Sequence, residues 1–235
     1  MDYNIYGYTV ERSFIDLDNL YEVEGILQKI LEEKLSFEYY ENDVLIRIEN
    51  FIDINSRLRD ILLNPKMMNK IESLLGDKAV LFKDKVNFKY PGGVADELHQ
   101  DVQAKWDDYG TKDFITVGIS LDECTVETSC VYFYKKQIEG RRRMLGQYSQ
   151  PLSWELFDKN DFEPLIAAAG DVSFHDVYAP HFSEVQKSKK QRRVIWLTFN
   201  AVSSGDFREQ YYVDKLKNYP PNNKRKKGVN YEFKV

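Results

Sequence analysis

The sequence predicts an α+β fold in which a few helices pack against one side of an antiparallel sheet or barrel. Up to about residue 75 the apolar residues recur mainly at helical spacing, and from Ala79 onward their period changes to two. Aromatic residues make up 14% of the chain, which favours strands and a pocket with aromatic walls.

Two helical segments and one strand are expected before the period changes. Asp18 is a suitable N-cap for a first helix that runs to about Leu35. Residues 44–48 alternate like a strand. A second helical stretch spans residues 56–75, where Asn64-Pro65 interrupts it and Gly76 closes it.

The strands of the second part are expected at residues 79–90, 114–121, 130–134, 167–174 and 192–201. Pro91-Gly92-Gly93 ends the first of them, and Gly170-Asp171 forms a turn within the fourth. Beyond them, lysines and arginines gather between Lys215 and Lys227. Because the whole chain is acidic, we interpret this basic stretch as a solvated terminus rather than a contact for phosphates.

Composition argues against several classes of partner. The net charge is −5, from 33 basic and 38 acidic residues, so no overall positive field draws in nucleic acid or an anionic membrane. No apolar run is long enough to span a bilayer, and the N-terminal residues do not resemble a signal peptide. Only Cys124 and Cys130 are present, which favours a reduced pair in a cytoplasmic protein.

His99 and Asp101 form a candidate metal site. On an extended strand, residues two apart point to the same face, so one imidazole and one carboxylate aim at one point. A histidine from elsewhere would complete two histidines and one carboxylate, the set that leaves positions open on the Fe(II) of non-haem oxygenases. His175 and His181 both qualify as the third ligand by position.

Arg192 suggests what else the site binds. If His181 ends one strand and Arg192 opens the next, a hairpin brings both to one cavity, with Arg193 on the opposite face. An inward arginine needs an anion, and the distal carboxylate of 2-oxoglutarate suits the bidentate guanidinium. Ser183 lies two residues beyond His181 and could donate to the same carboxylate.

These motifs stand in the order of a known family. Residues 81–93 precede the triplet His99-Gln100-Asp101, and residues 170–174 precede His181-Phe182-Ser183 and Arg192. In this, the chain resembles the phytanoyl-CoA dioxygenase (PhyH) family of Fe(II)/2-oxoglutarate oxygenases over about residues 6–221. The end of the chain, residues 205–215, resembles small bacterial members that act on natural-product-like molecules.

The resemblance implies a double-stranded β-helix, or jelly roll, with the N-terminal helices packed on one sheet. We expect a single domain, residues 1–235, with a mainly helical part at 1–78, a jelly-roll core at 79–201 and a tail at 202–235. The implied iron ligands are His99, Asp101 and His181, with His175 as the rival of His181. The implied partners of 2-oxoglutarate are Arg192, Ser183 and, as a weaker transfer, Asn87.

The same resemblance implies Fe(II), 2-oxoglutarate and O2 as cofactor and co-substrates. The expected reaction is hydroxylation or desaturation of an unactivated C–H bond of a small molecule, in a biosynthetic pathway, with release of succinate and CO2. Related halogenases lack the carboxylate, so Asp101 argues against halogenation. We expect the substrate to contact Gln103, Lys105 and Trp106, just after the iron motif. Residues 127–130 and 134–143 depart from the family pattern, which leaves the substrate open.

Three other functions compete with this one. A cupin-type metalloenzyme would need a metal but not 2-oxoglutarate. A jelly-roll binding protein would have kept the fold without turnover. A nucleic-acid demethylase would need a basic groove with stacking aromatic residues, and only the C-terminal tail offers such charge.

Overall fold

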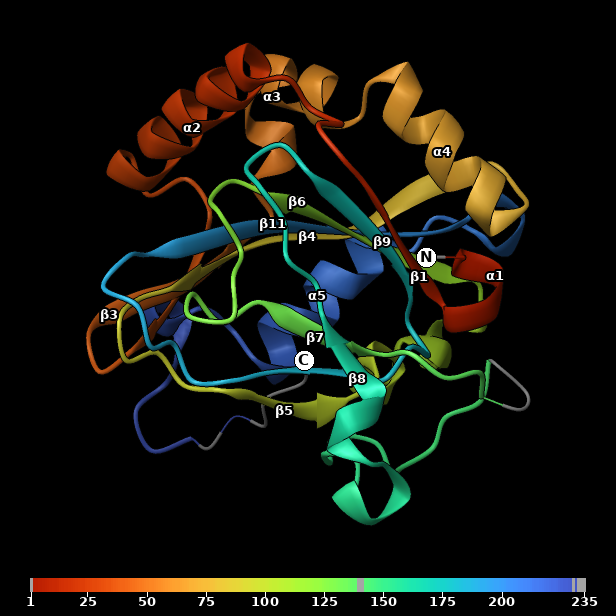
Figure 1. Cartoon of the computed structure of the whole chain (residues 1–235). Helices are drawn as coiled ribbons and strands as arrows, with labels where there is room; N and C mark the ends of the chain where they lie inside the picture. Colours follow the sequence, from red (N-terminus) through yellow and green to blue (C-terminus); the bar gives the residue numbers. More distant parts are fainter. Residues whose placement is uncertain (1, 139–141, 230, 232–235) are drawn as a thin grey trace.

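Two antiparallel sheets face each other in the computed structural model, which describes residues 2–138, 142–229 and 231 (Figure 1). The larger sheet has the order β1-β9-β6-β11-β4-β3-β2, and the smaller has the order β5-β10-β7-β8. This is the double-stranded β-helix that the sequence led us to expect. The larger sheet contains β1 (Tyr8–Glu11), β2 (Phe37–Glu41), β3 (Val44–Glu49), β4 (Ala79–Lys89), β6 (Phe114–Ser120), β9 (Val172–Asp176) and β11 (Arg192–Ala201); the smaller contains β5 (Asp96–His99), β7 (Val131–Tyr134), β8 (Phe162–Pro164) and β10 (His181–Ser183).

The outer face of the larger sheet carries the main hydrophobic core. Three helices lie over it, α2 (Leu17–Glu32), α3 (Ser56–Leu62) and α4 (Pro65–Leu75), while the short α1 (Tyr3–Tyr6) precedes β1 (Figure 1). Their buried residues, such as Val23, Leu58 and Ile71, form one cluster with Val86, Ile195 and other outward residues of the sheet. The inner face is thus left to the cavity between the two sheets.

The sequence predicted most helix boundaries. Asn64 caps α4 through its side chain, Pro65 takes the first helical position and Gly76 ends the helix with a φ of 80°. The expected N-cap of the first helix was wrong by two residues. Asp16, not Asp18, accepts the hydrogen bond from the backbone N–H of Asn19, and Asp18 lies in the first turn.

The basic stretch near the C-terminus was only partly interpreted correctly. Residues 208–218 form a helix, α5 (Arg208–Asn218), which contacts β4. Its Lys215 is only 5% exposed and its ammonium lies 3.4 Å from the Glu49 carboxylate of β3. Lys217, Lys224 and Lys226 are exposed, as expected. The solvated stretch therefore begins within the last turn of this helix, at Lys217, and not at residue 215.

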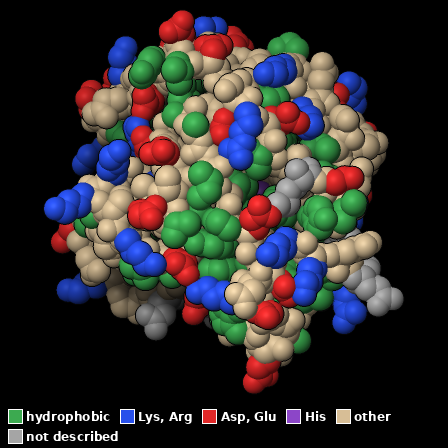
Figure 2. All heavy atoms as spheres, in the orientation of Figure 1, with side chains coloured by type: hydrophobic (Ala, Val, Ile, Leu, Met, Phe, Trp, Pro, Cys, Tyr) green, Lys and Arg blue, Asp and Glu red, His purple; other side chains and the backbone are tan. Residues whose placement is uncertain are grey.

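Surface charge and free cysteines agree with the composition. Lysines and arginines are interspersed with acidic residues over the face in Figure 2. Cys124 and Cys130 are both buried and free. None of the helices in the described part of the chain is long and apolar enough to cross a membrane.

Candidate metal centre

Two histidines meet across neighbouring strands of the smaller sheet. His99 at the end of β5 is the direct partner of His181 at the start of β10, and their ring centroids are 4.2 Å apart. In each ring Nδ1 faces a backbone carbonyl, that of Glu97 at 2.6 Å and that of Ala179 at 2.9 Å. A proton on Nδ1 leaves the Nε2 lone pair of each histidine free to bind a metal.

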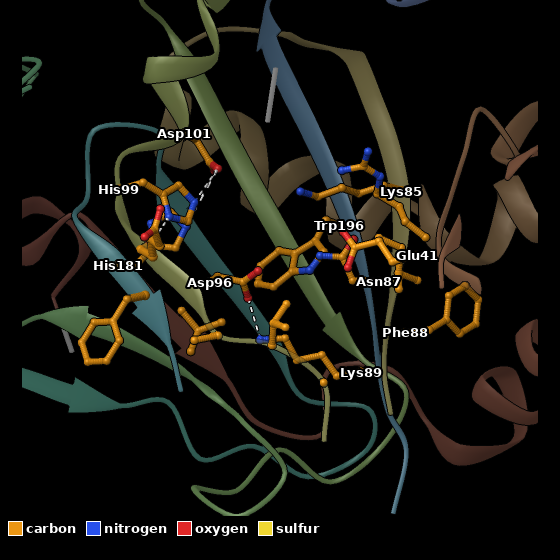
Figure 3. Close-up of a pocket in the computed structure, with 18 of the residues that line it drawn as sticks. Glu41, Lys85, Asn87, Phe88, Lys89, Asp96, His99, Asp101, His181 and Trp196 are labelled. Atoms are coloured by element: carbon orange, nitrogen blue, oxygen red, sulfur yellow. Dashed lines mark hydrogen bonds and ion pairs between the residues drawn. The ribbon is translucent and has the colours of Figure 1, made fainter. Parts of the chain in front are cut away.

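Asp101 completes the group, although by a different backbone path from the one expected. The strand ends at His99, and Asp101 opens a 3-10 turn. Its Oδ1 lies 3.9 Å from Nε2 of both His99 and His181. The ligand atoms of these three residues all lie within 4.8 Å of one another, so the group can hold one metal ion (Figure 3).

His175 is held apart from this group. Its Nε2 lies 3.0 Å from the other carboxylate oxygen of Asp101, Oδ2, which also accepts a hydrogen bond of 3.2 Å from the hydroxyl of Thr116. The arrangement leaves Oδ1 for the metal and supports His181, not His175, as the third ligand.

The charges suit a cation. Burial and the neighbouring His99 lower the pKa of His181 to about 3, so its imidazole is neutral at pH 7. Burial works to raise the pKa of Asp101, but the hydrogen bond from His175 and the charges around it hold that pKa well below its usual range. Two histidine imidazoles and one carboxylate fit Fe(II) with positions left open.

The metal site opens into a cavity of about 600 Å³ between the sheets. Trp196 of β11 lies across its wall, next to Gly118 of β6. A Cβ on Gly118 would come within 2.4 Å of the Trp196 ring, so a glycine is needed there. Trp106 also lines the cavity and packs against Phe82 and Phe114, so it belongs both to the wall and to a buried hydrophobic cluster. Its contact with a substrate stays a prediction.

Arg192 lies in the same cavity, as expected. Its side chain is 2% exposed and donates only to the backbone carbonyls of Thr128 and Ser129. Within the described ranges, no carboxylate pairs with it. Arg193, by contrast, points to the helical side and pairs with Asp122 and Glu24. A buried guanidinium with only neutral partners is suited to an anionic ligand.

Ser183 is less available than the sequence suggested. Its hydroxyl donates to the Asp96 carboxylate at 2.6 Å and accepts from the Lys89 ammonium. Lys89 and Asp96 are themselves paired at 2.8 Å, and Lys89 is the cross-strand partner of Arg192. Ser183 therefore lies beside Arg192's strand but already has partners. Its contact with 2-oxoglutarate stays a prediction.

Asn87 and Lys85 of β4 both line the cavity. The Asn87 side-chain oxygen is buried and without a hydrogen-bond partner among the described residues. Lys85 was not predicted, although the period of two that places Asn87 on the inner face places Lys85 there as well. The alternation therefore contained a signal for Lys85, whereas Asn87 was expected only from the family resemblance.

Of the other two expected substrate contacts, Gln103 lines the cavity and Lys105 does not. The amide of Gln103 accepts from the backbone N–H of Gln100 and donates to the carbonyls of Gln147 and Gln150, so it closes the turn after the iron motif. Lys105 is not among the residues that line the cavity. It connects two 3-10 turns with a φ of 62°, and its ammonium lies 5.8 Å from the centre of the Tyr148 ring. The expectation for Lys105 was wrong.

Comparisons with known proteins agree with this geometry. The family model of phytanoyl-CoA dioxygenase (PhyH) matches residues 3–194. The chain is 34% identical to a 2-aminoethylphosphonate dioxygenase of an uncultured bacterium, HF130_AEPn_1, over 80% of this chain and 71% of that one. It is 33% identical to a methylphosphonate hydroxylase of Gimesia maris, over 74% of this chain and 65% of that one.

Solved structures show the same fold at lower identity. EctD from S. alaskensis, solved with 2-oxoglutarate and 5-hydroxyectoine, superposes with a TM-score of 0.76 at 16% identity, over 86% of this chain and 74% of that one. The epimerase SnoN, solved with Fe3+ and α-ketoglutarate, has a TM-score of 0.71 at 15% identity, over 99% of this chain and 92% of that one. Together with the family match and the His99–Asp101–His181 group, these findings mean that the chain belongs to the PhyH family and is an Fe(II)- and 2-oxoglutarate-dependent dioxygenase.

Proposed function

We propose that this enzyme hydroxylates a C–H bond of a small organophosphonate. The observation that carries the proposal is the cationic lining of the cavity beside the iron ligands. The described lining residues include the cations Arg47, Lys85, Lys89 and Arg192. Of the four acidic residues in the lining, Asp101 faces the metal site, Asp96 is paired with Lys89, and Glu41 and Glu97 are exposed.

The cations exceed what 2-oxoglutarate needs. We infer that the distal carboxylate of 2-oxoglutarate binds Arg192, because that guanidinium lacks a carboxylate partner and can bind a carboxylate through two N–H groups. Lys85 and Arg47 then remain for the substrate. Two of the relatives are named for acting on phosphonates, which are small anions with a tetrahedral head.

The bound cofactor supplies the oxidation: Fe(II), 2-oxoglutarate and O2 convert R–H to R–OH with release of succinate and CO2. The protein's own residues orient the partners. His99, Asp101 and His181 would hold the metal, while Thr116 and His175 contact the second carboxylate oxygen of Asp101. Trp196 and Trp106 wall the cavity and keep water from the reacting C–H bond.

The product identifies this reaction directly. In the presence of Fe(II), 2-oxoglutarate and ¹⁸O2, 2-aminoethylphosphonate or methylphosphonate should gain one labelled oxygen atom, with one succinate formed for each product. Succinate without any phosphonate product would contradict the substrate class. Metal-dependent conversion without succinate would instead indicate a cupin-type enzyme that does not use 2-oxoglutarate. The place of the reaction in a biosynthetic pathway stays a prediction.

A further inference from the structure

We propose that Arg47, Lys85 and Asn87 form a second anion subsite, separate from Arg192, that binds the oxyanion head of the substrate. The inference rests on the proposed function and assigns its substrate recognition to three side chains of β3 and β4. All three line the cavity of the metal site. The carbon to be oxidised then lies on the side of the substrate nearer the metal.

Sheet register places these side chains together. Arg47 of β3 is the direct cross-strand partner of Asn87 of β4, so the two share the inner face. Lys85 lies two residues before Asn87 and shares that face as well. Figure 3 shows Lys85 and Asn87 beside each other, with Trp196 between them and the iron ligands. The subsite therefore occupies the β3–β4 end of the cavity.

The two cationic groups lie in different directions from the metal. The hydroxyl of Thr116, on β6, contacts Asp101, and β6 is followed in the sheet by β11, β4 and β3. Arg192 is the first residue of β11 and lies four residues before Trp196 on that strand. Lys85 and Arg47 are reached across the sheet, where each strand adds about 4.8 Å. One ligand can therefore extend toward Arg192 while another extends toward Lys85.

The ammonium group of Lys85 is available to a ligand in the cavity. It forms neither a hydrogen bond nor an ion pair with any described residue. Burial lowers the pKa of its ammonium, while the negative charge of Asp101 acts in the opposite direction. The side-chain oxygen of Asn87 is buried and has no hydrogen-bond partner among the described residues, so the amide can hydrogen-bond to a ligand. Because the oxygen and nitrogen of an amide are assigned from its surroundings, this side chain can present its NH2 to an anion.

Arg47 is fixed by Glu49 and Tyr39. Its Nε lies 3.0 Å from the carboxylate of Glu49, and its guanidinium stacks 4.5 Å from the centre of the Tyr39 ring. Glu49 shares the inner face of β3 with Arg47 and is the direct cross-strand partner of Lys85. Glu49 in turn contacts Lys215 of α5. The side chain therefore loses little freedom when it binds a ligand, which favours affinity.

The donor set favours a tetrahedral oxyanion over a carboxylate. A planar guanidinium, an ammonium and an amide on two strands approach a ligand from different directions and can serve the three oxygens of a phosphonate. A carboxylate offers two oxygens in one plane, for which a guanidinium such as that of Arg192 suffices. The subsite thus gives the enzyme a physical basis to distinguish its phosphonate substrate from its dicarboxylate co-substrate.

Kinetics of paired variants test the assignment. In Arg47→Gln and Lys85→Met, the KM for 2-aminoethylphosphonate should rise about tenfold to a hundredfold, and in Arg47→Lys it should rise less, while the KM for 2-oxoglutarate stays within about twofold. Arg192→Gln should show the reverse pattern. Arg57→Gln is the matched control, since Arg57 is an exposed arginine paired with Glu22 outside the cavity.

Binding without turnover gives a second readout. Under anaerobic conditions with Fe(II) and 2-oxoglutarate, 2-aminoethylphosphonate should change the fluorescence of the cavity tryptophans. The Kd for 2-aminoethylphosphonate obtained from this change should be larger in Arg47→Gln. The proposal is overturned if Arg47→Gln and Lys85→Met raise the KM for 2-oxoglutarate instead, or if they lower only the melting temperature. A wrong proposed function would already appear in the parent enzyme, as succinate without phosphonate oxidation.

Discussion

At the scale of residues, Asp101 is held so that only one of its oxygens is available to a metal. Thr116 and His175 contact Oδ2, while Oδ1 faces His99 and His181. A carboxylate restrained in this way binds iron through one oxygen and leaves neighbouring coordination positions for 2-oxoglutarate and O2. Such outer contacts commonly contribute tenfold or more to metal affinity.

Thr116 tests this contribution without removing a ligand. Thr116→Val, which keeps the shape but loses the hydroxyl, should weaken Fe(II) binding about tenfold in an anaerobic competition with a fluorescent chelator. Thr116→Ser should restore most of the affinity. An unchanged affinity in Thr116→Val, with a lower melting temperature of the metal-free protein, would show that the hydroxyl is only structural.

Sequence spacing pointed to His99 with Asp101 and to Arg192, and the resemblance to the PhyH family supplied His181 as the third ligand. The spacing rule worked although Asp101 opens a 3-10 turn and does not continue the strand that ends at His99. It could not show that the amide of Gln103, which does line the cavity, is held by the carbonyls of Gln147 and Gln150, more than forty residues away in the chain. No local pattern reports such a contact. Lys105 was expected near the substrate only because it follows the iron motif, but the backbone turns there with a φ of 62° and Lys105 lies outside the cavity lining.

At the scale of elements, α5 was not predicted because a buried lysine weakens the helical period of its apolar residues. Its buried face consists of Tyr211, Tyr212 and Lys215, so one of its inward positions is a lysine and the apolar period is weak. Burial works to raise the pKa of Glu49, but Lys215 and Arg47 outweigh it and lower that pKa to about 2. The short strands β2 and β8 were likewise missed, since they are too short for a clear alternation.

Lys215 should contribute substantially to stability because it partners a fully buried carboxylate. Lys215→Met should lower the free energy of unfolding by about 2–4 kcal/mol, measured from the urea midpoint, since the buried carboxylate of Glu49 would lose a cation that contacts it. Lys217→Met, at an exposed position of the same helix, should change it by less than about 0.5 kcal/mol. Equal effects of the two substitutions would contradict a structural role of the buried pair.

At the scale of the whole molecule, the two sheets divide the work of the site. The smaller sheet brings His99 and His181 together, and the larger sheet contributes Arg192 from β11. Helices cover the outer face of the larger sheet, so its inner face is free to carry lysines and arginines that would be costly inside a conventional core. Periodicity predicted an α+β fold with helices on one side of a sheet or barrel, and the family resemblance implied the double-stranded β-helix. The cationic cavity could be recognised only from the register between strands.

The central claim is that Fe(II) and 2-oxoglutarate bind together between the two sheets, through His99, Asp101, His181 and Arg192. Anaerobic titration of the Fe(II)-loaded protein with 2-oxoglutarate, followed by visible absorption, tests it most directly. We predict a weak charge-transfer band that saturates with 2-oxoglutarate, is lost in His181→Ala and needs far more 2-oxoglutarate in Arg192→Gln. No band in the parent protein, or the same band in His181→Ala, would contradict the account.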